Sequence, residues 1–399
     1  MSPGLAGASQ RVAQRGSGSG STGTPACARC KPRYKLFQLA AVPFLATLSL
    51  SSVTATVATP ADTNSLRIYF IDVEGGQATL FVTPEGQSLL IDTGWPGNAG
   101  ADPNSTTPGA TLATPRDADR ILAAAKDAGI SKLDFVLITH YHVDHVGGVS
   151  QLAERIPIGT FVDHGKNREP DTQFTKVFFE AYQNVLASGK YQHIVAKPGD
   201  ILPIKGMRAE IVTSDGAVLQ KPLPGAGQPN PACDHFNPPA DNSENHYSVG
   251  TLITFGKLRI LDLGDLTSDK EKDLMCPHNR LGHVDIYIAS HHGLFRSGSA
   301  ALVHAIAPRM AIVDNGATKG GSPSALDIIK SSPGIAGTWQ LHFSEEAAEH
   351  NAPPEYLANP QGPDAGNYLK LTIGPDGSFG VFNSRTKQTQ QYAVVRLIR

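Results

Sequence analysis

Four side chains that can bind a metal ion lie within six consecutive residues: His140, His142, Asp144 and His145, in the pattern His-x-His-x-Asp-His. They follow an apolar run at residues 133–138, which predicts a strand that ends where the four side chains begin. Neutral imidazole nitrogens and carboxylate oxygens are ligands that Zn²⁺ and related ions take in proteins. The spacing predicts a metal site on a loop at a strand end. A merely histidine-rich surface loop would not explain why further ligand types recur downstream.

Three other apolar runs also end in polar motifs. Asp92 lies in an Asp-Thr-Gly motif, Asp265 in Gly-Asp, and His291 and His292 in His-His-Gly. Each run is short and bounded, as expected for a buried strand. Taken in order with the histidine-rich loop, the four motifs resemble the metallo-β-lactamase superfamily. Any one of them alone would be weak support, whereas all four in order are specific to a fold.

The resemblance narrows to one subgroup. Residues 66–78 are similar to the opening of the metallo-β-lactamase domain of ComEC-type competence proteins, and the likeness extends over residues 66–343. It implies an α/β fold in which two sheets are enclosed by helices, the four-layer αββα metallo-β-lactamase sandwich, over residues 61–399. It also implies a hydrolase that uses a metal-activated water. The motif order is much less specific to the substrate than to the fold.

The resemblance implies two neighbouring metal sites. His140 and His142 would hold a first ion, and Asp144 and His145 a second. Asp265 would bridge the two, so Asp144 and Asp265 are the expected catalytic carboxylates. The implied cofactor is one or two Zn²⁺ ions, with Mn or Fe as alternatives.

One imidazole of the His-His-Gly motif would complete the second site. We expect His291, which comes first after its strand, and leave His292 as a possible substrate contact. Asp92 is expected to orient the metal loop through hydrogen bonds, although an ordinary turn-capping aspartate is the alternative.

Many members of the superfamily supply a third histidine to the first metal, and this chain has none at the matching residues 211–216. His164 ends another predicted strand and is a candidate substitute ligand or substrate contact. A surface or core histidine is the alternative. The first ion is therefore expected to be held weakly, and operation with one metal is a second possibility.

The first sixty residues do not look like part of the fold. Basic residues precede an apolar run at 36–50 and small residues follow it, the order of regions in a secretory signal. We expect residues 1–60 to be a disordered N-terminus with a signal peptide and the protein to be periplasmic or secreted, with an uncleaved anchor as the alternative. Cys233 and Cys276 are expected to form a disulfide after export, unless they are unrelated thiols.

Composition restricts the partners. The chain has 399 residues with 34 basic and 36 acidic side chains, so it shows no basic surplus and no clear nucleic-acid patch. No apolar stretch after residue 50 is long enough to span a membrane, which favours a free-standing catalytic domain over a transporter. The first hypothesis is a small-molecule or phosphoester substrate, in particular a phosphodiester. The alternatives are a lactonase or β-lactamase-like hydrolase of C–O or C–N bonds, and an inactive binding protein.

The pattern also predicts secondary structure and two long irregular loops. Phe174, Val177, Phe178, Tyr182 and Val185 recur at helical spacing, which predicts core packing. The predicted elements are strands at 66–73, 78–82, 89–91, 368–373 and 379–382, helices at 117–128, 147–154 and 174–188, and loops at 95–115 and 219–245.

Overall fold

A computed structural model describes residues 64–96 and 116–393 of the chain. The chain divides into two units, Met1–Ala58 and Thr59–Arg399. The predicted leader at 1–60 and nearly all of the predicted loop at 95–115 lie outside the described residues. Within the described part of the chain, no helix combines the length and apolarity needed to cross a membrane.

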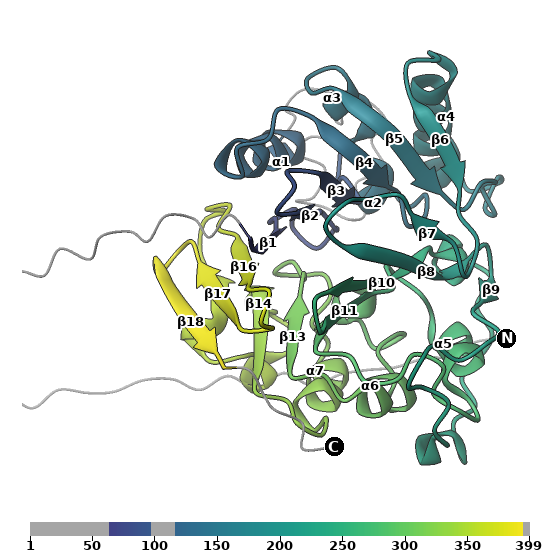
Figure 1. The fold of residues 1–399 in the computed structure, drawn as a ribbon, viewed down its shortest axis with the longest axis vertical. Coiled ribbons are helices and arrows are strands. Elements are labelled where there is room, and N and C mark those ends of the chain that lie inside the picture. Colours follow the sequence, from purple (N-terminus) through teal and green to yellow (C-terminus); the bar gives the residue numbers. More distant parts are fainter. Residues whose placement is uncertain (1–63, 97–115, 394–399) are drawn as a thin grey trace, which may run out of the picture. The chain divides into compact units, whose positions relative to one another are not determined.

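Two nine-stranded sheets form the centre of the structure (Figure 1). In the first sheet the order is β18-β17-β16-β1-β2-β3-β4-β5-β6, and in the second it is β15-β14-β13-β12-β11-β10-β8-β7, with β9 paired to β8. The first contains β1 Leu66–Phe70, β2 Thr79–Val82, β3 Ser88–Ile91, β4 Leu133–Leu137, β5 Ile158–Asp163, β6 Gln192–Val195, β16 Leu369–Ile373, β17 Phe379–Asn383 and β18 Gln388–Tyr392. The second contains β7 Ile201–Leu202, β8 Arg208–Ser214, β9 Ala217–Val218, β10 Gly250–Phe255, β11 Leu258–Asp262, β12 Ile286–Ile288, β13 Met310–Val313, β14 Gly337–His342 and β15 Leu357–Asn359.

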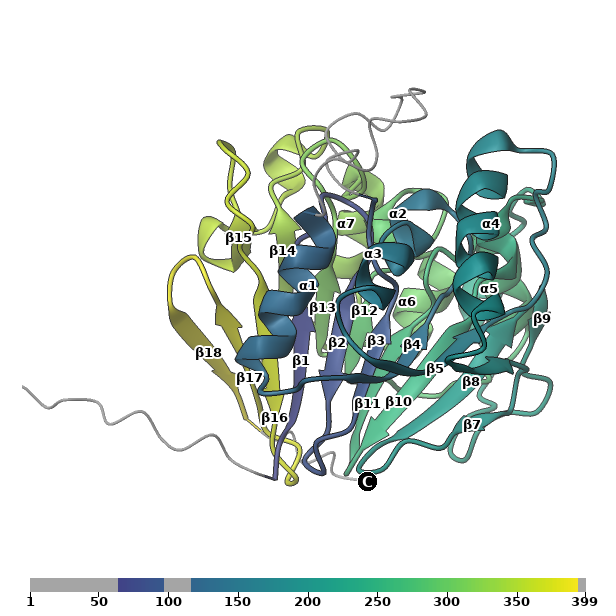
Figure 2. The ribbon, with the colours of Figure 1, turned by 90° about the horizontal axis from the view of Figure 1, so that it is seen from above.

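Helices cover the outer face of each sheet, as Figures 1 and 2 show. Over the first sheet lie α1 Arg116–Asp127, α2 Val143–Val146, α3 Val149–Ala153 and α4 Gln173–Ala187. Over the second lie α5 Ser268–Met275, α6 Ala300–Ile306 and α7 Pro323–Lys330. The four layers confirm the predicted αββα sandwich.

Three apolar cores hold the layers together. One lies between the sheets and one lies under the helices on each outer face. Side chains alternate between the two faces of a strand, so a single strand contributes to two cores, as β1 shows. Ile68 and Phe70 face the core between the sheets, whereas Tyr69 faces the core beneath the helices.

Most predicted elements are present, with one correction. The helix predicted at 147–154 is present as α3, and a separate short helix, α2, precedes it. In α4, Tyr182 is buried, but Phe174 and Val177 are 39% and 42% exposed. The prediction that they pack in the core is wrong, because helical spacing places residues on one face without showing how far the covering sheet extends.

Strand direction brings the motifs together. β3 and β4 are parallel neighbours in the first sheet, and β11 and β12 are parallel neighbours in the second. Their carboxyl ends lead into the four polar motifs. Gly264, with φ of +54°, lies where the two sheets meet, and a Cβ there would be 2.8 Å from the Cβ of Thr139. Only glycine permits both this backbone conformation and this close approach.

Candidate metal centre

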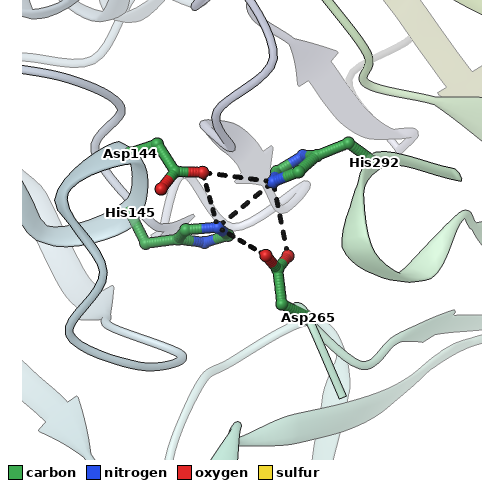
Figure 3. Close-up of side chains that lie close together, drawn as sticks. All are labelled: Asp144, His145, Asp265 and His292. Atoms are coloured by element: carbon green, nitrogen blue, oxygen red, sulfur yellow. Dashed lines mark hydrogen bonds and ion pairs between the residues drawn. The ribbon is translucent and has the colours of Figure 1, made fainter. Parts of the chain in front are cut away.

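Four side chains that can bind a metal converge between the two sheets. Asp144, His145, Asp265 and His292 each offer a nitrogen or oxygen, and these atoms all lie within 4.8 Å of one another (Figure 3). The Nε2 atom of His145 is 3.1 Å from Oδ2 of Asp144 and 3.3 Å from Oδ2 of Asp265. The Nε2 atom of His292 is 3.3 Å from Oδ2 of Asp144 and 3.3 Å from Oδ1 of Asp265. All four side chains are buried. They come from three chain segments that are far apart in the sequence, since only Asp144 and His145 are neighbours in the chain.

His140 and His142 lie beside this cluster. Nε2 of His140 is 3.1 Å from Nδ1 of His142 and 3.9 Å from Oδ2 of Asp265. The Asp265 carboxylate therefore borders both groups of ligand atoms, which is the position that a bridging carboxylate requires. The two histidines predicted for a first ion and the residues predicted for a second are adjacent in space.

The two histidines of the His-His-Gly motif differ in position from the expectation. His292, rather than His291, belongs to the four-residue cluster. Nε2 of His291 is 3.4 Å from Oδ2 of Asp265, while its Nδ1 is 3.3 Å from Oγ of Ser297. Both histidines have positive φ, 56° and 55°. This turn of the backbone, which no periodicity in the sequence indicates, decides which ring points to the cluster.

Asp92 contacts Thr139 and His145, at the two ends of the histidine-rich loop, on the side away from the cluster. Its Oδ2 accepts a hydrogen bond from Oγ1 of Thr139 at 2.7 Å and lies 2.7 Å from Nδ1 of His145, while its Oδ1 accepts from the Thr139 amide at 2.8 Å. A carboxylate on Nδ1 keeps the proton there and leaves Nε2 free for an ion. Burial raises the pKa of Asp92, although His145 and Thr139 oppose the shift.

The cluster is strongly charged. Burial disfavours an imidazolium, but the carboxylates of Asp265, Asp144 and Asp92 raise the pKa of His145 well above its usual value. Burial likewise opposes the charge of His292, but the carboxylates of Asp265 and Asp144 together raise its pKa to about 10. Protons on these nitrogens occupy the positions where a cation would bind, so metal binding here releases protons.

Sequence reasoning missed two residues near the centre, Glu169 and Lys319. Glu169 has its Oε2 3.2 Å from Nε2 of His142, which leaves Nδ1 of His142 directed to His140. Lys319 donates from Nζ to Oδ2 of Asp144. His164, a candidate ligand, instead lies buried with Nε2 3.0 Å from Oε2 of Glu244 and outside the cluster. Neither Glu169 nor Lys319 lies in a recognisable motif.

A second group of metal-capable residues contains Asp72, Glu74 and His342. Their atoms are already paired, since Nε2 of His342 is 2.7 Å from Oδ1 of Asp72 and Nη1 of Arg120 is 3.2 Å from Oδ2 of Asp72. This group is an ion-pair network that joins β14 to the loop after β1. The four-residue cluster fits a cation better, because it supplies two imidazoles and two carboxylates within 4.8 Å of one another.

Comparisons with known proteins agree with this geometry. The family model described as "Metallo-beta-lactamase superfamily" matches residues 72–230. "Recombination protein 2" of Haemophilus influenzae is 25% identical over 248 residues, which cover 62% of this chain and 24% of that protein. "Hydroxyacylglutathione hydrolase" of Aliivibrio salmonicida is 34% identical over 95 residues, 22% of this chain and 36% of that protein. The chain thus spans only about a quarter to a third of the length of these relatives.

Among solved structures, the metallo-beta-lactamase fold protein YhfI from Bacillus subtilis has 12% sequence identity and a TM-score of 0.41, and the match covers 69% of this chain and 96% of that one. The family model covers the histidine-rich loop and the Asp-Thr-Gly motif. The observed fold and the order of the four motifs agree with it. Residues 72–230 of the chain thus match the metallo-beta-lactamase superfamily.

Proposed function

We propose that the protein is an exported, metal-dependent hydrolase that cleaves a phosphodiester or phosphoester. The main support is the pair of adjacent ligand groups that share Asp265. Two-metal sites of this type occur in enzymes that stabilise both the attacking and the leaving oxygen of a displacement at phosphorus. The similarity to "Recombination protein 2" spans 248 residues and so extends beyond the histidine-rich loop.

The residues have distinct roles in this proposal. One ion would be held by Asp144, His145, Asp265 and His292. His140 and His142, which lie beside Asp265, would help to hold a second. Bound ions would lower the pKa of a water ligand towards neutral and polarise the scissile ester. Asp92 and Glu169 orient His145 and His142 by accepting hydrogen bonds at their other ring nitrogens. Zn²⁺ suits this ligand set, as do Mn²⁺ and Fe.

A second candidate is hydrolysis of an acyl C–O, C–S or C–N bond, as in a lactonase or β-lactamase-like enzyme. Its support is the 34% identity over 95 residues to a protein named hydroxyacylglutathione hydrolase. An inactive binding protein is a weaker third reading, because the metal-capable side chains of the motifs are present and lie together, all of them buried except His142. Metal content separates it from both hydrolases.

Export is part of the proposal. Cys233 and Cys276 form a disulfide in the structure, and disulfides persist mainly in oxidising compartments. The proposed leader would direct the chain there. Mass spectrometry of the N-terminus after expression in a Gram-negative host would identify a cleaved leader. A full-length, cytosolic and reduced chain would contradict export.

Asp265→Ala tests the centre. Loss of the shared carboxylate should abolish hydrolysis of bis-p-nitrophenyl phosphate and lower the metal content, while the fold measured by circular dichroism stays largely intact. Asp327→Ala is the matched control, since that side chain is 55% exposed on α7. Wild-type turnover of nitrocefin or an acyl-glutathione thioester without diester cleavage would favour the second candidate. Full activity in Asp265→Ala would refute the two-metal assignment.

A further inference from the structure

One cation lies against the cluster of acidic and histidine side chains. Lys319 lies in the loop between β13 and α7, and its Nζ donates to Oδ2 of Asp144. Of the lysines and arginines in the described ranges, only Lys319 makes an ion pair with Asp144 or Asp265. Its side chain remains 25% exposed, whereas Asp144 is 7% exposed. Lys319 therefore lies at the boundary between the buried cluster and the solvent.

The loop that carries Lys319 is held firmly on both sides. The amides of Gly321 and Ser322 donate to the carbonyls of His292 and Gly293 at 2.8 and 2.9 Å. A Cβ on Gly320 would be 2.3 Å from the carbonyl oxygen of His292. The lysine is therefore attached to the same turn that places His292 in the cluster, and its position is coupled to the position of that ring.

The opposite side of the lysine is also enclosed. A Cβ on Gly75 would be 3.0 Å from the Cβ of Lys319, so the loop after β1 lies directly against it. The Lys319 ammonium is 5.3 Å from the centre of the Trp95 ring, within reach of a cation–π interaction. The ammonium is consequently positioned in advance of any ligand, which lowers the entropic cost of using it for binding.

The position of the ammonium is unfavourable for metal binding alone. Oδ2 of Asp144 faces Lys319 and also Nε2 of His145 and of His292, so the ammonium shares an oxygen that points into the cluster. A fixed positive charge next to a cation site repels the cation. An anionic ligand between the two would remove this repulsion and would be attracted by both charges.

We propose that Lys319 is a substrate-binding residue that receives a negatively charged phosphoryl oxygen beside the metal centre. This inference rests on the proposed function for the substrate class. A phosphodiester has two non-bridging oxygens that share a negative charge, so one can face the ions while the other accepts from Nζ of Lys319. A neutral ester or lactam offers no second anionic oxygen at the reacting atom. Lys319 therefore favours the phosphodiester substrate over a neutral acyl substrate.

Binding of inorganic phosphate to the full, metal-loaded chain tests the inference without turnover. Titration calorimetry should give a Kd about 10- to 100-fold weaker in Lys319→Met than in the wild type, the range expected for loss of one charge-assisted hydrogen bond. Lys319→Arg should retain most of the affinity. Lys132→Met is the matched control, because Lys132 also pairs with a buried aspartate, Asp134, but lies at the opposite end of β4.

Two further readouts separate binding from structural support. The KM for bis-p-nitrophenyl phosphate should rise in Lys319→Met, while metal content and thermal midpoint stay close to those of the wild type. Phosphate should also change the fluorescence of Trp95, and this change should be lost with Lys319→Met. An unchanged phosphate Kd, or a loss of metal and stability with no change in KM, would overturn the inference.

The outcomes also distinguish this inference from the proposed function. Phosphate binding that depends on Lys319 in a chain that cleaves no diester would refute the proposed reaction but keep the oxyanion site. Dependence on Lys319 for acetate but not for phosphate would overturn the phosphoryl assignment. Absence of phosphate binding in the metal-loaded wild type would overturn it as well.

Discussion

Replacement of Asp92 by asparagine should weaken metal binding without removing any predicted ligand. Asp92 accepts from the Thr139 amide through Oδ1, and its Oδ2 lies 2.7 Å from both Oγ1 of Thr139 and Nδ1 of His145. In Asp92→Asn the Oδ1 bond can persist, but an NH₂ group faces His145. Two donors cannot pair, so His145 must move its proton to Nε2, the atom that faces the cluster.

The structure sets the expected magnitude. Loss of a carboxylate that orients a metal-bound histidine typically costs about 10- to 100-fold in metal affinity, or about 1.4–2.7 kcal/mol. Asparagine tolerates the positive φ of 59° at this position, so backbone strain should add little. Loss of the charge-assisted hydrogen bond should also lower the free energy of unfolding of the metal-free protein by about 1.5–3 kcal/mol.

A control in the neighbouring strand β4 separates these two effects. Asp134 is also buried and accepts from the Ser88 amide and hydroxyl, with no histidine among these partners. Asp134→Asn should lose comparable stability and keep its metal affinity. Competition of Zn²⁺ between protein and a chromophoric chelator gives the affinity, and urea unfolding gives the stability. Equal metal affinity in Asp92→Asn and Asp134→Asn would refute the role assigned to Asp92.

Two further predictions concern parts of the fold away from the centre. The disulfide between Cys233 and Cys276 closes a loop with a sequence separation of 43. The double variant Cys233→Ser/Cys276→Ser should therefore have a free energy of unfolding about 4 kcal/mol lower in urea melts. An unchanged urea midpoint would contradict this prediction. Burial opposes the positive charge of His342, yet the hydrogen bond with Asp72 raises the pKa of His342. The ion pair therefore stabilises the fold fully below the unfolded-state pKa of about 6.5. This stabilisation is lost as the pH rises through the raised pKa of the folded state. The difference in unfolding free energy between the wild type and His342→Gln should therefore be larger at about pH 6 than at about pH 9, and a difference that does not vary with pH would refute the pairing.

The sequence predicted the fold well because the motifs and the strands are local features. Each apolar run that the sequence predicts as a strand before a polar motif is one in the structure, at β3, β4, β11 and β12. Hydrophobic patterning reads such strands directly. It failed for Phe174 and Val177, because exposure depends on which neighbouring element covers a helix, and spacing along the chain contains no such information.

The candidate site was predicted less completely. The family pattern placed His140, His142, Asp144, His145 and Asp265 in one region, and the structure brings these side chains together. It favoured His291 as the ligand, whereas the structure places His292 in the four-residue cluster, because the directions of the two rings depend on two successive residues with positive φ. Asp92 was expected to orient the loop, and its contacts with Thr139 and His145 agree with that expectation. The ligand roles themselves stay predictions until metal binding is measured.

Taken alone, the sequence determined which residue types stand at the ends of four strands and in what order. These features are local, so they can be predicted without knowing how the elements pack. The tertiary structure decided which side chains meet, because the approach of Gly264 to Thr139 brings two sheets into contact and the Gly320 loop carries Lys319 to Asp144. Glu169 and Lys319 lie outside every motif, and only the folding of distant loops onto one centre gives them neighbours with which they can act.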